Sequence, residues 1–144
     1  MKIFNQIQIM KKVHSTIFEK ISLKYNLTEC EIMILMFLDE NENQDMAADI
    51  VKSLMISKAH VSGLVNNLEN QGYIIKKIDC KDRKKIHLEV TETAKVIVKA
   101  VKKEKKKMKD AIFGDLTKVE IETMQRVLNK IKKNLKTNYD IELI

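Results

Sequence analysis

The stretch DIVKSLMISKAHVSGLVNNLENQGYIIKK, residues 49–77, decides the fold of this chain. Apolar residues recur here at intervals of three and four and predict a short helix from about Met46 to Lys52 or Ser53. After a tight turn, the hydroxyl of Ser57 suits the N-cap of a second helix. Two helices joined by so short a turn are typical of a helix-turn-helix, in which the first helix braces the second.

The second of these helices has two contrasting faces. Its inward stripe is predicted at Val61, Leu64, Val65 and Leu68. Small and polar residues remain on the outward face, and such side chains suit the major groove of DNA, where Asn and Lys can bond to base edges. The predicted DNA-binding residues of this helix are Ser57, Lys58, Ala59, His60, Ser62, Gly63, Asn66 and Asn67. For His60, a partly exposed helix residue with no ligand is an equally good interpretation.

Beyond Gly72, which suits a helix C-terminus, the apolar period changes from about four to two. Alternation over 74–78 and again over 86–90 predicts a β-hairpin whose tip spans 79–84. A basic hairpin beside a helix-turn-helix is a wing, which can reach phosphates or the minor groove. The predicted DNA-binding residues of the wing are Lys81, Asp82, Arg83, Lys84 and Lys85.

Four longer segments complete the predicted fold, and each has a helical apolar period or a capping signal. They are a helix over 2–25, a buried helix after the capping box Thr28–Glu31, a helix from Thr91 to about Phe113-Gly114, and a helix from the capping box Thr117–Glu120 to Leu135. The sequence therefore predicts a mainly α protein with a small β-hairpin wing, a six-helix winged helix-turn-helix.

Composition and charge narrow the classes of function. The 144 residues include no proline and three glycines, which excludes collagen and most all-β folds. The net charge of +7 is concentrated in two segments: 76–85 has six basic and two acidic residues, and 95–109 has eight Lys and one Glu. Such segments suit a polyanion, because Lys and Arg displace counterions from phosphates. A solvated face remains the alternative for the second segment.

Several classes of site find no support in the sequence. The chain has no Gly-rich phosphate loop, no ordered catalytic triad and no metal-spaced cluster, so we expect no enzyme, no cofactor and no metal. Cys30 and Cys80 make no disulfide framework and are expected as free thiols, and whether either senses redox state stays open. The longest strongly apolar run, 32–38, is far below the ~20 residues that span a bilayer, and no export signal is visible, which favours the cytoplasm.

The order and spacing of these motifs resemble the MarR (multiple antibiotic resistance regulator) family of winged-helix transcription regulators. Residues 49–77 are similar to the helix-turn-helix of that family, and DCKDRKKIHLEVTETA, residues 79–94, to its wing and the entry into the next helix. Thr117 to Leu135 is similar to its C-terminal dimerisation helix. The similarity runs from about Thr28 to Leu135.

The resemblance implies a homodimer that binds double-stranded DNA at a pseudo-palindromic operator. The implied organisation is a dimerisation arm at 1–27, a DNA-binding lobe at 28–90, dimerisation helices at 91–136 and a tail at 137–144. It also implies a small-molecule or other signal of unknown identity that releases the DNA, and repression is the commoner role in the family. The residues that it assigns to dimerisation are Ile3, Phe4, Ile7, Met10, Val119, Met124, Leu128, Ile131 and Leu135.

Two departures from the family pattern bear on DNA recognition. Lys84 stands where the wing of the family usually has an Arg, so that either Lys84 or Arg83 is expected to enter the minor groove. Gly63 stands where many relatives have a long basic side chain. A helical protein-interaction module and a non-specific DNA-binding basic protein remain the alternatives to a specific regulator, and the basic hairpin favours the regulator.

Overall fold

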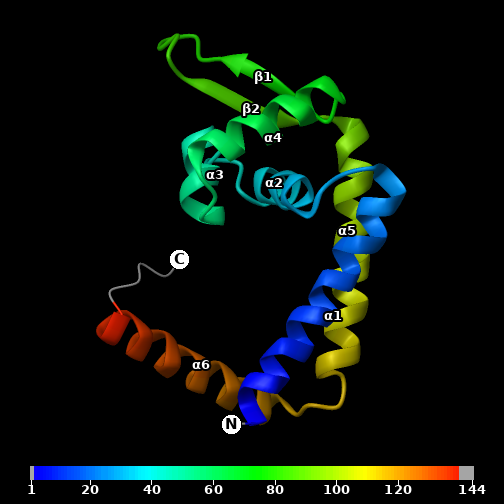
Figure 1. Ribbon diagram of the computed structural model, residues 1–144, viewed down its shortest axis with the longest axis vertical. Helices are drawn as coiled ribbons and strands as arrows, with labels where there is room; N and C mark the ends of the chain where they lie inside the picture. Colours follow the sequence, from blue (N-terminus) through cyan, green and yellow to red (C-terminus); the bar gives the residue numbers. More distant parts are fainter. Residues whose placement is uncertain (1, 140–144) are drawn as a thin grey trace. The chain divides into compact units, whose positions relative to one another are not determined.

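The computed structural model describes residues 2–139, apart from the side chain of Ile3. The predicted role of Ile3 in dimerisation therefore lies outside the described side chains. The chain packs as two units, Met1–Lys105 and Lys106–Ile144, and each is considered by itself. The elements in chain order are α1 (Lys2–Tyr25), α2 (Glu29–Glu40), α3 (Ala47–Leu54), α4 (Lys58–Asn70), β1 (Ile74–Ile78), β2 (Ile86–Val90), α5 (Glu92–Phe113) and α6 (Lys118–Tyr139) (Figure 1).

The core of the first unit forms around α2. Ile32, Ile34 and Leu35 are fully buried there, as the uninterrupted apolar run of this helix requires. The core also includes Phe18 of α1 and Ile97 of α5. Parts of α1 and α5 thus share the core of the first unit, and the functional divisions at 27/28 and 90/91 stay predictions.

Side-chain caps fix the starts of α2 and α6 as the sequence predicts. The Thr28 hydroxyl accepts the Glu31 amide at 3.2 Å, and the Glu31 carboxylate accepts the Thr28 amide at 2.8 Å. The same reciprocal pair joins Thr117 and Glu120 at the start of α6. These caps pair backbone amides that a helix start would otherwise leave without partners.

Two helix boundaries differ from the prediction. Helix α3 begins at Ala47 and continues through Leu54, because the Asp49 carboxylate accepts the Met46 amide at 3.0 Å and Met55 then takes a left-handed conformation with φ 55°. Helix α6 continues to Tyr139, and the Thr137 hydroxyl donates to the Lys133 carbonyl at 3.0 Å. The tail predicted at 137–144 is therefore helical at 137–139, and 140–144 lie outside the described residues.

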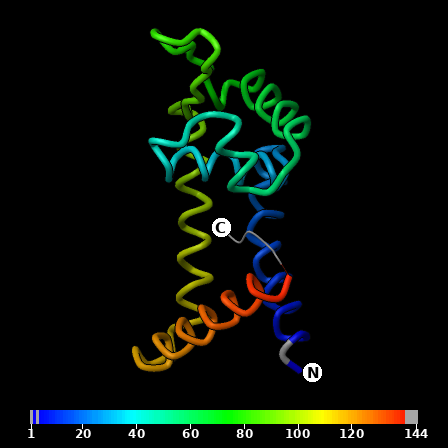
Figure 2. Tube along the Cα trace, turned by 90° about the vertical axis from the view of Figure 1, so that its left-hand side faces the viewer, coloured from blue at the N-terminus to red at the C-terminus, as the bar shows by residue number. Residues whose placement is uncertain are grey.

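The two strands pair antiparallel, from Ile74 opposite Val90 to Ile78 opposite Ile86. Figures 1 and 2 both show this hairpin projecting beyond the helices of the first unit. The near end is part of the core, where Ile74 is 1% exposed, whereas Ile78 at the far end is 68% exposed. The six-helix winged helix-turn-helix is thus confirmed, and the hairpin has a buried base and a free tip.

The second unit has an apolar stripe without a covering element inside the unit. Of the described residues of α6, none is buried. Four predicted dimerisation residues on α6 are exposed and Met124 is half-buried. On α1, Phe4, Ile7 and Met10 are exposed as well. The exposed four on α6 are Val119, Leu128, Ile131 and Leu135.

Candidate DNA-binding surface

Helix α4 presents its polar face to solvent. The Ser57 hydroxyl accepts the His60 amide at 3.3 Å and so caps the helix start. The predicted inward stripe is confirmed, since all four of its residues are buried. The eight residues predicted to bind DNA are all exposed: Ser57, Lys58, Ala59, His60, Ser62, Gly63, Asn66 and Asn67. Because α3 packs against α4, the exposed face has a firm support. The DNA-binding role of these residues stays a prediction.

One of these eight has a partner on the hairpin. The Lys76 ammonium donates to Asn66 Oδ1 at 2.7 Å and pairs with the Glu69 carboxylate at 2.6 Å. This network joins α4 to β1 and leaves the Asn66 amide group as a free donor. An Asn that bonds an adenine edge uses both its oxygen and its nitrogen, so Asn66 would have to release Lys76 in order to do so.

Gly63 leaves a gap on the exposed face. Apart from its chain neighbours and the backbone of its own helix, a Cβ placed on Gly63 would have no atom within 4 Å. The packing of the described residues therefore does not require a glycine at position 63. The missing side chain affects only the exposed face of α4.

Two aspartates build the wing tip. Asp79 Oδ1 accepts the amides of Lys81 at 2.8 Å and of Asp82 at 2.7 Å. Asp82 Oδ1 accepts the Lys84 amide at 3.0 Å. The hydrogen bonds from the Asp82 and Lys81 amides, and then the one from His87, lower the pKa of Asp79. Both carboxylates are therefore turn-forming groups, and Asp82 has this local role whether or not it also lies near DNA.

The basic side chains of the wing tip are available to contact a binding partner. Lys81, Arg83, Lys84 and Lys85 are exposed, and within the described part of the chain none of them forms an ion pair. The wing thus presents four cations on a turn held by backbone hydrogen bonds. Asp82 holds the Lys84 backbone amide but pairs with neither the Arg83 nor the Lys84 side chain, so the choice between them for the minor groove stays open.

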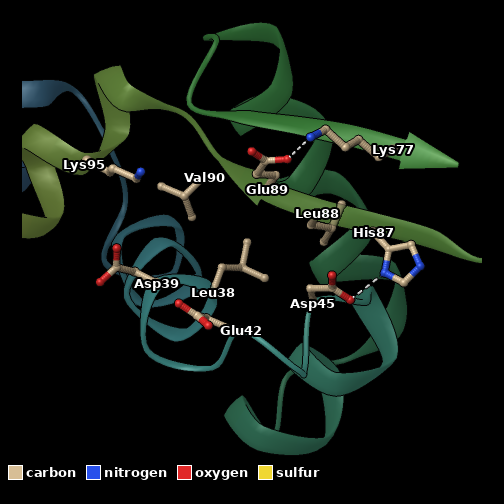
Figure 3. Close-up of a pocket in the computed structure, with 10 residues that line it drawn as sticks. All are labelled: Leu38, Asp39, Glu42, Asp45, Lys77, His87, Leu88, Glu89, Val90 and Lys95. Atoms are coloured by element: carbon tan, nitrogen blue, oxygen red, sulfur yellow. Dashed lines mark hydrogen bonds and ion pairs between the residues drawn. The ribbon is translucent and has the colours of Figure 1, made fainter. Parts of the chain in front are cut away.

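His87 on β2 connects the wing tip to the helix-turn-helix, a contact that sequence reasoning missed. Its Nδ1 lies 2.8 Å from Asp45 Oδ1, as Figure 3 shows, and its Nε2 lies 3.2 Å from Asp79 Oδ2. The hydrogen bonds to Asp45 and then to Asp79 raise the pKa of His87 above its ordinary value of 6.5. The main chain makes a second connection, since the Leu88 amide donates to the Asp45 carbonyl at 2.8 Å.

A polar pocket of about 320 Å³ lies beside this contact, between the end of α2, β2 and the start of α5. Most of its charges are already paired: Glu89 with Lys77, and Asp39 with Lys102 at 2.6 Å. The bond to Asp39 also raises the pKa of Lys102. The lining residues drawn in Figure 3 are Leu38, Asp39, Glu42, Asp45, Lys77, His87, Leu88, Glu89, Val90 and Lys95.

The remaining sequence-based predictions concern the two cysteines, metal binding and membrane-spanning segments. Cys30 is half-buried and Cys80 exposed, and both are free thiols as predicted. Within residues 2–139, no group of His, Cys, Asp and Glu side chains is arranged to hold a metal ion. None of the described helices is long and apolar enough to cross a membrane.

Comparison with known proteins agrees with this geometry. Residues 27–86 match the MarR family. No curated protein matches the chain. Among solved structures, the chain is similar to a MepR–DNA complex from Staphylococcus aureus, with a TM-score of 0.75, 23% identity and coverage of 92% of this chain and 94% of that one. It is also similar to a MarR protein from Peptoclostridium difficile, with a TM-score of 0.77, 19% identity and coverage of 95% and 89%.

A third similar structure is the transcriptional regulator SlyA, with a TM-score of 0.76, 19% identity and coverage of 97% of this chain and 98% of that one. At such identities the solved structures establish the fold. The match over 27–86 falls on α2, α3, α4, β1 and the wing tip, and ends at the first residue of β2.

Proposed function

We propose that the protein, whose residues 27–86 match the MarR family, is a homodimeric transcription regulator that binds DNA at a pseudo-palindromic operator. One observation carries the proposal: the polar face of α4 is fully exposed beside a hairpin tip with four cations. The fold is also that of MepR from Staphylococcus aureus, whose structure was solved in a DNA complex.

We assign base contacts to α4 because its exposed side chains are short and polar. Ser62 and Asn66 lie one helical turn apart on the outer face, and Lys58 lies one turn before Ser62. A helix with such a face fits the major groove, and its N-terminal residues come nearest the bases. Gly63 reduces the contact area, so we expect specificity from few direct contacts and from the shape of the DNA.

The wing supplies phosphate or minor-groove contacts. Lys81, Arg83, Lys84 and Lys85 extend from a turn that is fixed by Asp79 and Asp82. Within the described residues, neither carboxylate forms an ion pair with these cations. Contacts of this kind position the protein on the duplex and make binding salt-dependent.

A second copy of the chain is the partner that fits the exposed apolar stripes. An amphipathic helix buries its apolar face against another element, yet Val119, Leu128 and Ile131 of α6 remain 69%, 54% and 42% exposed. Phe4 and Met10 on α1 are 63% and 54% exposed. In a two-fold dimer, the same stripes would meet their counterparts and place two copies of α4 about one turn of DNA apart, ~34 Å.

We further propose that the protein acts in the cytoplasm as a repressor released by a signal. A ligand that binds one spacing of the two lobes better than another would shift the population away from the DNA-binding spacing.

The test is a mobility-shift assay with the DNA upstream of the gene that encodes this chain, at two salt concentrations and against random competitor DNA. Preferential retention of the upstream DNA supports the proposal, and light scattering of the free protein should give the mass of two chains. Equal binding of all DNA would instead favour a merely basic protein. Binding of no DNA would favour a helical protein-interaction module.

A further inference from the structure

The strongest remaining feature of the molecule is the pair of carboxylates on His87. Both ring nitrogens lie within hydrogen-bond distance of a carboxylate oxygen, Asp45 Oδ1 at 2.8 Å and Asp79 Oδ2 at 3.2 Å. Asp45 precedes α3, whereas Asp79 forms the wing tip. A single side chain therefore spans the helix-turn-helix and the wing, whose relative position decides whether both can contact one duplex.

The chemistry of this bridge selects one protonation state. Neutral imidazole has one N–H donor and one bare nitrogen, while imidazolium has two donors. An ionised carboxylate can only accept. With neutral His87, one carboxylate would face a bare nitrogen, and that half of the bridge would be lost.

From this geometry we propose that His87, in its imidazolium form, is a positioning residue that holds the wing tip against the helix-turn-helix in the orientation that binds DNA. The inference rests on the proposed function and adds to it a titratable connection between the two DNA-contacting parts. His87 touches no DNA in this account. It acts through Asp79, whose other oxygen fixes the turn that carries Arg83 and Lys84.

The remaining charges around His87 do not replace the bridge. Lys77 lies opposite His87 in the strand register and pairs with Glu89. On α3, the Asp49 carboxylate is occupied by the Met46 amide. The other ionisable residues that line the adjoining pocket are Asp39 of α2, Glu42 of the following loop and Lys95 of α5. Asp39 and Lys95 have ion-pair partners of their own, Lys102 and Glu92.

The direction of the pH effect follows from the two carboxylates. They raise the pKa of His87, so the bridge is complete below the ordinary value of 6.5 and is lost as the pH rises through the raised value. The wing stays joined to the lobe at high pH, because the Leu88 amide still bonds to the Asp45 carbonyl. What is lost is the orientation of the tip, and we expect weaker DNA binding without unfolding.

A first test needs no DNA. Carbon-detected or proton–carbon NMR of the imidazoles, with His14→Gln, His60→Gln and His87→Gln used for assignment, gives the pKa of each histidine in the full chain. We expect the value for His87 to lie above 6.5, and Asp79→Asn to lower it. A pKa of His87 at or below 6.5 would overturn the inference.

The second test uses the upstream duplex identified by mobility shift, with anisotropy titrations from pH 5.5 to 8.5 at constant salt. We expect His87→Gln to bind about fivefold more weakly than the parent chain at pH 6, a coupling of ordinary size, and to approach the parent at pH 8.5. His60→Gln is measured in parallel, because His60 lies on the predicted contact face.

Asp79→Asn is the most discriminating variant. Its carboxamide oxygen can keep the amides of Lys81 and Asp82, while its NH₂ can donate to the bare nitrogen of neutral His87. With imidazolium, the same NH₂ would face an N–H donor, so this variant should favour neutral His87 and should not lose affinity as the pH rises. Asp115→Asn is the matched control, since it makes the same charge change at an exposed position between α5 and α6, outside α4 and the wing, and it should keep the parent profile.

The outcomes separate the two proposals. If the parent chain shows no preference for any duplex, the proposed function fails while the NMR titration still reports on the bridge. If the chain binds its duplex and His87→Gln follows the parent profile at every pH, the positioning role of His87 is wrong and the proposed function stands.

Discussion

Removing the charge of Arg83 and Lys84 tests the wing most sharply. Both side chains are exposed, and within the described residues neither is bound by another side chain. The turn beneath them depends on Asp79 and Asp82 and on backbone amides, which alanine retains. The double variant Arg83→Ala, Lys84→Ala should therefore keep its fold and lose only contacts to DNA.

The expected size follows from counterion release. Each phosphate contact contributes about 0.9 to the slope of log K against log salt, so two lost contacts lower the slope by roughly 1.8 for one wing and by about 3.6 for a dimer. If one of the two side chains enters the minor groove instead of contacting a phosphate, the change in the salt slope is about half as large. The variant then also loses affinity that depends on A·T base pairs at that position.

Fluorescence anisotropy at four NaCl concentrations measures this slope, and circular dichroism checks the fold. Lys11→Ala, Lys12→Ala is the matched control, because it removes two adjacent exposed charges from α1, away from the wing in sequence and in role. The control should keep the parent slope. An unchanged slope in the Arg83 and Lys84 variant would remove the wing from the mechanism.

Three further substitutions test separate parts of the account. Ser62→Glu places a carboxylate on the exposed face of α4 and should abolish binding in a mobility shift with an unchanged circular dichroism spectrum; retained binding would show that this face is not toward DNA. Gly63→Ala adds a methyl group that faces open space, so it should stabilise the chain by ~1 kcal/mol. Calorimetry should show this as a rise of about 4 °C in Tm, whereas a lower Tm would reveal a constraint on Gly63. Ile131→Lys should give the mass of one chain by light scattering, and an intact dimer would exclude this part of α6 from the interface.

Local features of this fold could be predicted from the sequence because their causes are local. The caps at Thr28, Ser57 and Thr117 join residues three positions apart, and a pattern of side chains reveals them directly. The buried and exposed faces of α4 follow in the same way from helical periodicity. The left-handed Gly72, with φ 75°, ends the helix where the sequence places it.

Features that depend on distant residues could not be predicted. His87 and Asp45 are 42 positions apart, and no local pattern indicates that their side chains meet. The bond from Lys76 to Asn66 likewise depends on how the hairpin packs against α4. The extension of α3 through Leu54 was missed because the left-handed Met55 ends the helix without a glycine.

Chemical interference on the operator duplex is the most direct test of the central claim, that α4 binds the major groove while the wing binds alongside it. Dimethyl sulfate methylates guanine N7 in the major groove and adenine N3 in the minor groove, so the two contacts give separate signals. For the parent chain, we expect two patches of N7 interference about one helical turn apart, each flanked by N3 interference. In the Arg83→Ala, Lys84→Ala variant, we expect the N3 interference to disappear. N3 interference alone, or interference spread evenly along the duplex, would contradict the central claim.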